Sequence, residues 1–396
     1  MYVYVKSKNG KPLMPTVPAV ARLLLKEKKA KVIRTNPFTI KLLKETTNYK
    51  QQITAGMDAG SKTIGCAAIS DGKVVYQSEV TIRDDIKNKM TQRRQYRRTR
   101  RSRKVRYRKA RFNNRGKEGK IAPSIKSKID SHIREKNFVE SILPITKWKV
   151  ELAAFDIHKI TNPEVNGIGY QNGNQKGFYN VKAFVLNRDN YTCQQCKKQN
   201  VKLECHHIVY RSKGGSNAPS NLITLCEKCH KDVHNDKISL KATKSKTKYA
   251  TEMGIVKSQL KKSKWKFVET FGYLTKYNRE QLLKLPKTHA NDAIAICYGG
   301  KNVISDDKIY YKRHVSKGDY QQTKGKRSEK KMPTGKLFGL RKFDLINTVK
   351  GIGFVKGKRS SGYFSICDIF NNVISSSVKV KTECTRIQAR KTTLIA

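Results

Sequence analysis

The sequence has few acidic residues and a large excess of basic ones. Only 30 of its 396 residues are Asp or Glu, whereas 85 are Lys or Arg, so the formal net charge is +55. A folded chain with this charge repels itself strongly, and a bound polyanion offsets that repulsion. Nucleic acid is the usual polyanion and is the partner that the composition predicts. A ribosomal-type protein and a basic protein on an anionic membrane are the alternatives.

Long apolar runs are also missing. No stretch approaches 18 uninterrupted apolar residues, so we expect no membrane-spanning helix. The first residues, MYVYVKSKNGKPLMP, lack the apolar core of a signal peptide. Apolar residues make up 37% of the chain and aromatic residues 8%, which is enough for several modest cores but not for one large core. With the length, this composition predicts two to four compact units.

The nine cysteines do not have the spacing of a disulfide framework. Four of them form two CxxC pairs, Cys193/Cys196 and Cys226/Cys229, with 29 residues between the pairs. Two such turns can place four thiolates around one zinc ion, whereas the other five cysteines are scattered. Four unrelated core cysteines are the alternative. We expect one structural zinc ion in a reducing compartment.

Acidic residues are absent between Arg93 and Arg111. Twelve of these nineteen residues are Arg or Lys, and neither Gly nor Pro interrupts the run RRQYRRTRRSRKVRYRKAR. A helix is therefore permitted, although like charges four residues apart destabilise it in isolation. A disordered basic tail is the alternative. Because the run lies between core-like segments, we expect an arginine-rich helix that binds nucleic-acid phosphates. The expected contacts are Arg93, Arg94, Arg97, Arg98, Arg100, Arg101, Arg103, Arg106 and Arg108.

Histidines cluster between and just after the CxxC pairs. Residues 204–208 read ECHHI, and His230 and His234 follow the second pair. Phosphodiester hydrolysis needs a base that works near neutral pH and a divalent cation that offsets charge on the leaving oxygen. Neighbouring residues on a strand point to opposite faces, so His206 and His207 are expected to have different tasks. His234 lies one helical turn after His230 and is either a further metal ligand or a capping residue.

This pattern resembles the HNH, or ββα-metal, nuclease motif. The resemblance implies that His207 is the general base and that His206 and His230 hold a magnesium ion. It also implies that Asn221 holds the loop and the base in place. A zinc-binding module without catalysis is the alternative.

A second group of candidate residues is dispersed along the chain. Asp58 lies in the segment MDAGSK, Glu151 lies on the expected strand 148–157, and His289 and Asp292 lie in KTHANDA. The H-x-x-D spacing places its two side chains on one face near a helix start. Carboxylate oxygens are the ligands that Mg²⁺ prefers, and a pair of ions clamps the attacking and leaving oxygens of an in-line displacement.

In this order, the dispersed residues resemble the three motifs of RuvC-type nucleases of the RNase H fold. The resemblance implies that Asp58, Glu151 and Asp292 hold two Mg²⁺ ions. It further implies that His289 polarises water or contacts the phosphate.

The whole chain resembles the IscB family, which are transposon-encoded RNA-guided nucleases related to the large CRISPR type II effectors. The resemblance is carried by the PLMP segment at residues 12–15, the arginine-rich run, the HNH insert before the third RuvC-like motif, and the tail segment GKRSSGYF. It implies a monomeric ribonucleoprotein of the prokaryotic cytoplasm that holds a structured guide RNA and binds double-stranded DNA. The HNH domain then cuts the guide-paired strand, the RuvC domain cuts the displaced strand, and the tail reads a short motif beside the target.

The expected fold is α/β. It consists of a split RNase H-like RuvC domain with an inserted ββα-metal HNH domain, an arginine-rich bridge helix and a small C-terminal β domain, which we expect to be a β-barrel. Residues 237–262 are expected to be a polar stretch, and residues 266–273 a strand. The expected domains are an N-terminal PLMP-type domain (1–50), RuvC-like part I (51–86), the bridge helix (87–115), RuvC-like part II with a linker (116–177), the HNH domain (178–236), a linker with RuvC-like part III (237–299), a basic segment that contacts RNA or DNA (300–335) and the C-terminal domain that reads the target-adjacent motif (336–396).

Two other functions use parts of the same evidence. An unguided HNH endonuclease of the homing or restriction type would not need Asp58, Glu151 and Asp292 in RuvC order. A zinc-containing RNA-binding protein without catalysis would need the basic helix and the cysteines, but not His207 or the carboxylates.

Overall fold

The computed structural model describes residues 2–47, 49–102, 121–152, 175, 177–213, 215, 217–240, 250–300, 303–305, 308–316, 335–382 and 384–396. The chain divides into two units, of which the first combines residues 1–153 with 255–396 and the second comprises residues 154–254. The second unit is therefore an insertion in the sequence of the first. Within the described ranges, no helix has both the length and the apolar character needed to cross a membrane.

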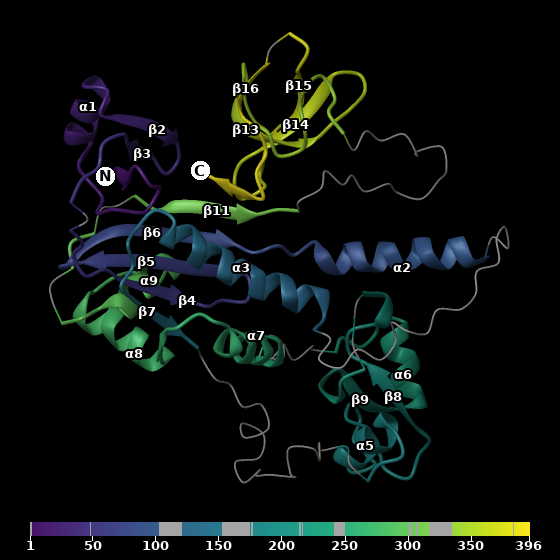
Figure 1. Cartoon of the computed structure of the whole chain (residues 1–396). Helices are drawn as coiled ribbons and strands as arrows, with labels where there is room; N and C mark the ends of the chain where they lie inside the picture. Colours follow the sequence, from purple (N-terminus) through teal and green to yellow (C-terminus); the bar gives the residue numbers. More distant parts are fainter. Residues whose placement is uncertain are drawn as a thin grey trace. The chain divides into compact units, whose positions relative to one another are not determined.

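A mixed seven-stranded sheet is the centre of the first unit (Figure 1). Its order is β10-β7-β4-β5-β6-β11-β17. The strands are β4 (Thr54–Asp58), β5 (Thr63–Ser70), β6 (Lys73–Thr81), β7 (Lys147–Glu151), β10 (Val268–Thr270), β11 (Tyr310–His314) and β17 (Thr393–Ile395). The strands β4, β5 and β6 follow one another in antiparallel order, which confirms the predicted hairpin and third strand. The strand β7 is parallel to β4, and β10 is parallel to β7.

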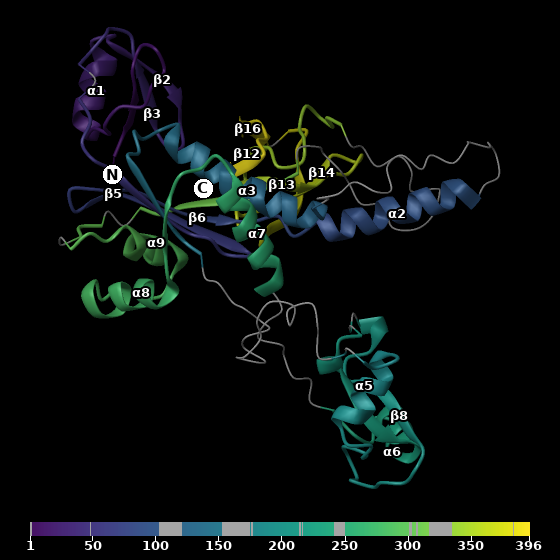
Figure 2. The same ribbon diagram turned by 60° about the horizontal axis from the view of Figure 1, so that its bottom comes forward.

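Two helices cover opposite faces of this sheet (Figure 2). The helix α9 (His289–Cys297) packs on the face that carries Gly56, because a Cβ atom there would meet the backbone oxygen of Ala293. The helix α3 (Pro123–Glu140) packs on the other face, where Tyr76 donates a hydrogen bond to Glu135. The result is three layers, with the buried apolar residues of β4, β5 and β6 between them.

The N-terminal residues form a small three-stranded sheet. It consists of β1 (Tyr4–Lys6), β2 (Ala30–Arg34) and β3 (Thr39–Leu42), with α1 (Pro18–Lys26) packed against it. The hydroxyl of Tyr4 donates to the backbone oxygen of Val75 on β6, at 3.0 Å. The arginine-rich run forms the helix α2 (Ile86–Ser102), as predicted, up to the end of the described range. Arg103, Arg106 and Arg108 lie outside the described residues.

The C-terminal residues form a five-stranded antiparallel sheet rather than the expected barrel. Its order is β15-β14-β13-β12-β16, so β15 and β16 are its edge strands. The strands are β12 (Leu345–Thr348), β13 (Gly351–Gly357), β14 (Tyr363–Cys367), β15 (Val373–Lys379) and β16 (Cys384–Gln388). The last strand, β17, does not belong to this sheet, because it pairs with β11 of the seven-stranded sheet.

The second unit is built around one β-hairpin and two helices. The strands β8 (Leu203–His207) and β9 (Leu222–Cys226) pair in antiparallel order, and α6 (Glu227–His234) begins directly after β9. The helix α5 (Val181–Arg188) precedes them and begins at Asn180, whose side chain caps the backbone N–H of Ala183. This is the predicted ββα arrangement around the cysteine pairs.

Two local predictions between residues 237 and 273 are wrong. Residues 250–262 form the helix α7 (Ala250–Lys262), because Met253, Val256 and Leu260 recur at helical spacing and are buried. The predicted strand 266–273 shrinks to β10, and Gly272 begins the helix α8 (Gly272–Tyr277), which continues as a π-helical turn over Asn278–Leu282. The predicted linker at 162–176 and basic segment at 300–335 lie mostly outside the described residues.

Candidate active sites

The four cysteines of the CxxC pairs converge in the second unit. Their sulfur atoms lie within 4.8 Å of one another, and the sulfurs of Cys196 and Cys226 are 3.7 Å apart. Tetrahedral coordination with zinc–sulfur bonds of about 2.3 Å separates neighbouring sulfurs by about 3.8 Å. Burial acts to raise the pKa of the Cys193 thiol, but backbone hydrogen bonds, with those from Cys196 and Cys226 foremost, lower it to about 6. A thiolate is therefore favoured at Cys193, whereas burial and the neighbouring cysteines raise the pKa of Cys229.

Three histidines form a second cluster in the same unit. His206 on β8 and His230 and His234 on α6 have ring nitrogens within 4.8 Å of one another. The Nε2 atoms of His230 and His234 are 3.3 Å apart. His206 is buried, and its Nε2 atom has no hydrogen-bond partner among the residues that the structure describes. Desolvation, followed by the neighbouring histidines, lowers the pKa of His206 to about 4, so its ring is neutral and able to bind a metal ion.

Glu204 orients one ring of this histidine cluster. Its Oε2 atom lies 2.7 Å from Nδ1 of His230. A carboxylate that accepts a hydrogen bond from Nδ1–H fixes the tautomer of the ring and leaves the lone pair of Nε2 for a metal ion. This arrangement is common around metal-binding histidines. The histidine cluster also includes His234, for which the sequence left two roles open, a metal ligand or a capping residue.

His207 and Asn221 lie outside the histidine cluster. For His207 this is what the alternation of side chains along a strand predicts. His207 follows His206 on β8, and its Nε2 atom is 3.0 Å from Oδ1 of Asn217. The side chain of Asn221 makes two hydrogen bonds to the backbone of Val209, at 3.0 and 3.1 Å. These bonds tie Asn221 to the loop that follows the histidine pair.

The strand register in the first unit brings Asp58 and Glu151 together. Asp58 ends β4 and is the direct partner of Glu151 at the end of the parallel strand β7. Side chains of partnered residues point to the same face of a sheet, so both carboxylates emerge side by side. In the other direction Asp58 is the partner of Gly65 on β5. We call Asp58, Glu151, His289 and Asp292 the carboxylate centre.

Two glycines allow α9 to lie close enough to complete the carboxylate centre. A Cβ atom on Gly65 would lie 1.9 Å from the backbone oxygen of His289, and one on Gly56 would lie 2.5 Å from that of Ala293. The helix starts at His289, where the side chain of Thr288 caps the backbone N–H of Asn291. Its first turn thus lies over the strand ends that carry the two carboxylates.

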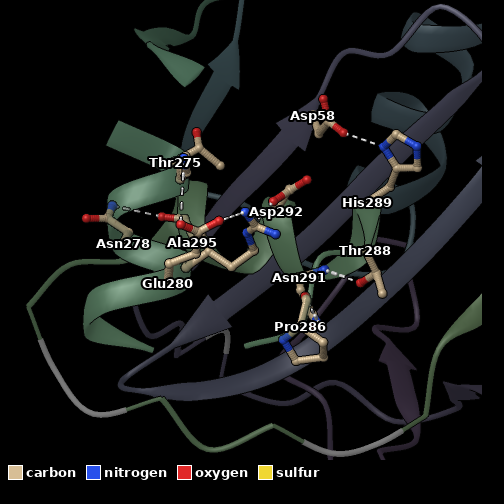
Figure 3. A network of polar contacts seen from close by, with 12 residues as sticks. Asp58, Thr275, Asn278, Glu280, Pro286, Thr288, His289, Asn291, Asp292 and Ala295 are labelled. Atoms are coloured by element: carbon tan, nitrogen blue, oxygen red, sulfur yellow. Dashed lines mark hydrogen bonds and ion pairs between the residues drawn. The ribbon is translucent and has the colours of Figure 1, made fainter. Parts of the chain in front are cut away.

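The side chains of this first turn make specific contacts (Figure 3). Nδ1 of His289 lies 2.6 Å from a carboxylate oxygen of Asp58. This hydrogen bond raises the pKa of His289 against the opposing effect of its partial burial. Asp292 forms an ion pair with the buried Arg279, at 3.0 Å. The pKa of Asp292 is nevertheless raised, because the effect of burial is larger than the lowering effect of the Arg279 guanidinium.

Glu151 completes the carboxylate centre from the side of α8. Burial raises its pKa, a hydrogen bond from Thr275 lowers it, and the charges of Asp58 and Asp292 raise it further. A cleft of about 390 Å³ opens here, lined by Glu151, Gly272, Thr275, Lys276, Arg279, Glu280, Lys287 and Asp292. Glu151 and Asp292 line this cleft, and the charge of Asp58 acts on both of them. Three carboxylates that repel one another in this way are a donor set for hard divalent cations.

Two segments of the chain match known families. Residues 193–236 match the family described as HNH endonuclease. The chain contains an HNH endonuclease domain. Residues 3–173 match the family described as RRXRR protein, and the combination of the two fits an IscB-like nuclease.

Two curated proteins are similar to short parts of the chain. The type IV methyl-directed restriction enzyme EcoKMcrA of Escherichia coli (strain K12) is 34% identical over 65 residues, which are 14% of this chain and 24% of that protein. Anaredoxin of Nostoc sp. (strain PCC 7120) is 36% identical over 56 residues, which are 14% of this chain and 74% of that protein. The chain therefore spans only about a quarter of the restriction enzyme, whose similarity supports a nuclease.

Sequence reasoning missed several residues that shape the two sites. In the HNH domain these are Glu204 and Asn217, and at the carboxylate centre they are Thr275 and Arg279. Glu204 stands two residues before the histidine pair, and alternation along a strand could have placed it on the same face as His206. Arg279 gave no signal, because one more basic residue does not stand out in this sequence.

The predicted phosphate-binding arginines of the RRXRR match lie on α2. Arg93, Arg94, Arg97, Arg98 and Arg101 are all exposed. A helix that is polar on every side is stabilised by a partner rather than by a core. The cleft between α2 and α3 has a volume of about 830 Å³ and is lined in part by Arg83, Lys89, Arg93 and Arg134. Its lining is basic and suits a phosphate backbone.

Proposed function

We propose that this protein is a metal-dependent, RNA-guided DNA endonuclease of the IscB type, with one hydrolytic centre in each unit. The observation that carries the proposal is the strand register that pairs Asp58 with Glu151 under the first turn of α9. An HNH domain alone does not require this second set of carboxylates. Residues 51–86, 116–152 and 255–299 then constitute the split RuvC-like domain.

In the HNH domain, His207 is the proposed general base. The Oδ1 atom of Asn217 can only accept a hydrogen bond, so Nε2 of His207 donates to it and Nδ1 remains to take a proton from water. Asn221 fixes the loop that follows, which keeps the imidazole in place. The zinc site of Cys193, Cys196, Cys226 and Cys229 anchors the start of α6 relative to the hairpin.

The donor set of His206, His230 and His234 fits a divalent ion. Three imidazole nitrogens suit a first-row transition ion such as Zn²⁺ better than Mg²⁺, which prefers oxygen. When bound, the ion offsets the charge that develops on the phosphate and on the leaving oxygen. Three protein ligands leave positions open for the phosphate. Glu204 holds His230 in the tautomer that this binding needs.

At the carboxylate centre, Asp58, Glu151 and Asp292 are the proposed Mg²⁺ ligands, whose oxygens fit that ion. The bound ions supply charge stabilisation for the attacking and leaving oxygens. Asp58 orients His289 through their hydrogen bond, so that the other ring nitrogen of His289 faces away from the carboxylate. Arg279 neutralises Asp292 and keeps it in position at the edge of the cleft.

A guide RNA bound to α2 is the proposed source of sequence specificity. The exposed arginines of that helix and the formal charge of +55 suit a large polyanion. Base pairing then reads the DNA, while the protein reads helix shape and a short motif beside the target.

The test is to purify the full chain from cells that express it with its neighbouring non-coding DNA, and to sequence the bound nucleic acid. We expect one long, defined RNA, and we expect cleavage to move to a new DNA sequence when the guide segment is replaced. Cleavage of DNA without any RNA would instead indicate an unguided endonuclease, for which the restriction-enzyme similarity is the supporting observation.

A further inference from the structure

Exposed aromatic side chains gather at the start of α8, beside the carboxylate centre. Phe271, Tyr273 and Tyr277 are exposed by 55%, 73% and 54% of their surface. The rings of Phe271 and Tyr273 are nearly parallel, with planes 15° apart and centroids 5.9 Å apart. Tyr273 and Tyr277 lie one helical turn apart and therefore share a face of α8. Large aromatic rings placed in water in this way mark an interaction surface.

Gly272 connects this surface directly to the carboxylate centre. It stands between Phe271 and Tyr273, and a Cβ atom on it would lie 3.0 Å from Oε1 of Glu151. Gly272 also lines the cleft that contains Glu151 and Asp292. On the opposite side of α8 from the tyrosines, the buried Thr275 lines the same cleft as Glu151, and its hydroxyl donates to the backbone oxygen of Phe271 at 3.3 Å. The short helix α8 thus contributes Thr275 to the cleft that contains the proposed metal ligands, while Tyr273 and Tyr277 are exposed to solvent.

The charge around the aromatic residues selects an anionic partner. Residues 271–287 contain four basic residues, Lys276, Arg279, Lys284 and Lys287, and one acidic residue, Glu280. Lys276, Lys284 and Lys287 are exposed, and two of them line the cleft. The cleft itself is lined by three basic residues, Lys276, Arg279 and Lys287, and by three acidic ones, Glu151, Glu280 and Asp292. Exposed aromatic rings beside basic side chains are a means by which proteins hold single-stranded nucleic acid, because every base offers a face for stacking. Paired bases of a duplex do not offer those faces.

We propose that Phe271, Tyr273 and Tyr277 form a base-stacking platform that holds a single strand of DNA as it enters the carboxylate centre. The platform places the phosphate that precedes or follows the stacked bases in the cleft beside Glu151, with Lys276 and Lys287 as its counter-charges. This inference rests on the proposed function of the carboxylate centre and names the form of its substrate. The platform residues are positioning residues, because they touch bases rather than the reacting phosphate.

Photo-cross-linking tests the platform without any cleavage. The full chain with Asp58→Ala is irradiated with a single-stranded DNA oligonucleotide in which one thymine is replaced by 5-iodouracil, and the cross-linked peptides are identified by mass spectrometry. We expect cross-links at Phe271, Tyr273 or Tyr277, and we expect the Phe271→Ala/Tyr273→Ala variant to lose them. Cross-links confined to other peptides would overturn the proposal. A clear preference for RNA, or protection of these residues by a second protein copy, would overturn it as well.

Cleavage of the same strand gives an independent measurement. In a His207→Ala background, only the carboxylate centre is expected to cut, so its rate on single-stranded DNA is read alone. Phe271→Ala/Tyr273→Ala should reduce that rate at low substrate concentration by about fivefold or more, which is the effect of losing stacking on one base. Tyr273→Phe keeps the ring and should cut normally, as should Tyr49→Ala, a matched control whose side chain is 78% exposed.

The two outcomes separate the platform from the proposed function. If Asp58→Ala does not stop this cleavage, the assignment of the carboxylate centre fails, whatever the cross-links show. If Asp58→Ala stops it but Phe271→Ala/Tyr273→Ala cuts at the unmodified rate and thermal unfolding is unchanged, the centre is correct and the platform is wrong.

Discussion

The HNH domain and the carboxylate centre reach comparable chemistry by opposite routes. All the candidate residues of the HNH domain lie between Cys193 and His234, on one hairpin, the turn that precedes it and one helix. The carboxylate centre draws Asp58 and His289 together across 231 positions of sequence. The first site depends on local spacing and a metal staple, whereas the second depends on the register and packing of a whole sheet. The two should therefore fail under different perturbations.

The largest expected effect comes from removing the structural zinc site formed by the four cysteines. Cys193→Ser should unfold the HNH domain, because structural zinc contributes about 10 kcal/mol or more to domains of this kind. The first unit should remain folded. Metal analysis and limited proteolysis measure both outcomes, and Cys205→Ser, a cysteine outside the quartet, is the control. Full protection of residues 178–236 in the Cys193→Ser protein would mean that the staple is dispensable.

The second perturbation should disturb the carboxylate centre and leave the HNH domain intact. It adds a methyl group between β5 and α9. Gly65→Ala places a Cβ atom where the backbone oxygen of His289 now lies, so the helix must move away from Asp58. Cleavage by the carboxylate centre should fall about a hundredfold or more, in line with the cost of a misplacement of about 1 Å, while HNH cleavage persists. Gly299→Ala, which has open space around its Cβ position, should change neither. Equal loss of both activities in Gly65→Ala would contradict the independence of the two sites.

A smaller effect separates the electrostatics of the two sites. Burial raises the pKa of Glu151 above its ordinary value. Its contribution to stability is therefore complete below the ordinary carboxyl range, near pH 4, and is lost as the pH rises through the raised pKa. At pH 7 and without Mg²⁺, the ionised carboxylate of Glu151 destabilises the first unit.

Glu151→Gln should consequently raise the melting temperature of the first unit, measured without Mg²⁺, by a few degrees at pH 7 and by less at pH 4, while abolishing cleavage at the carboxylate centre. The exposed Glu45→Gln is the control. A lower melting temperature in Glu151→Gln at pH 7 would show that this carboxylate stabilises the fold.

The smallest single effects are expected on α2, and they should touch both centres equally. Replacing Arg97, Arg98, Arg100 and Arg101 together by Gln should reduce the slope of log binding constant against log salt by about 3, since each phosphate contact contributes about 0.7–0.9. Any one replacement should be nearly silent, because many cations share the contacts. Salt titration of RNA binding measures the slope, and an unchanged slope would mean that these residues face elsewhere.

Local patterns predicted the parts of the fold that local physics determines. The CxxC pairs, the ECHHI strand and the two histidines of α6 have the geometry that their spacing implied. The three strands from Thr54 to Thr81 and the helix that starts at His289 were also predictable. The helix α7 was missed because its lysines obscured the helical spacing of Met253, Val256 and Leu260.

The rest depended on tertiary packing that composition conceals. Lys312 was counted among the cations for nucleic acid, yet it is fully buried and pairs with the buried Glu135 at 2.8 Å. The pairing of β17 with β11 could not be anticipated, because a three-residue strand at the end of the chain carries almost no pattern. The clearance provided by Gly56 and Gly65 is likewise visible only when α9 lies over the sheet.

The most direct test of two independent centres is strand-specific cleavage of a matched duplex, with each strand labelled at one end and with both Mg²⁺ and a first-row transition ion such as Zn²⁺ present. Asp58→Ala should cut only the guide-paired strand, and His207→Ala should cut only the displaced strand. The double variant should bind the duplex and cut neither strand. If Asp58→Ala still breaks both strands at the unmodified rate, the carboxylate centre is not a nuclease and the HNH domain acts alone.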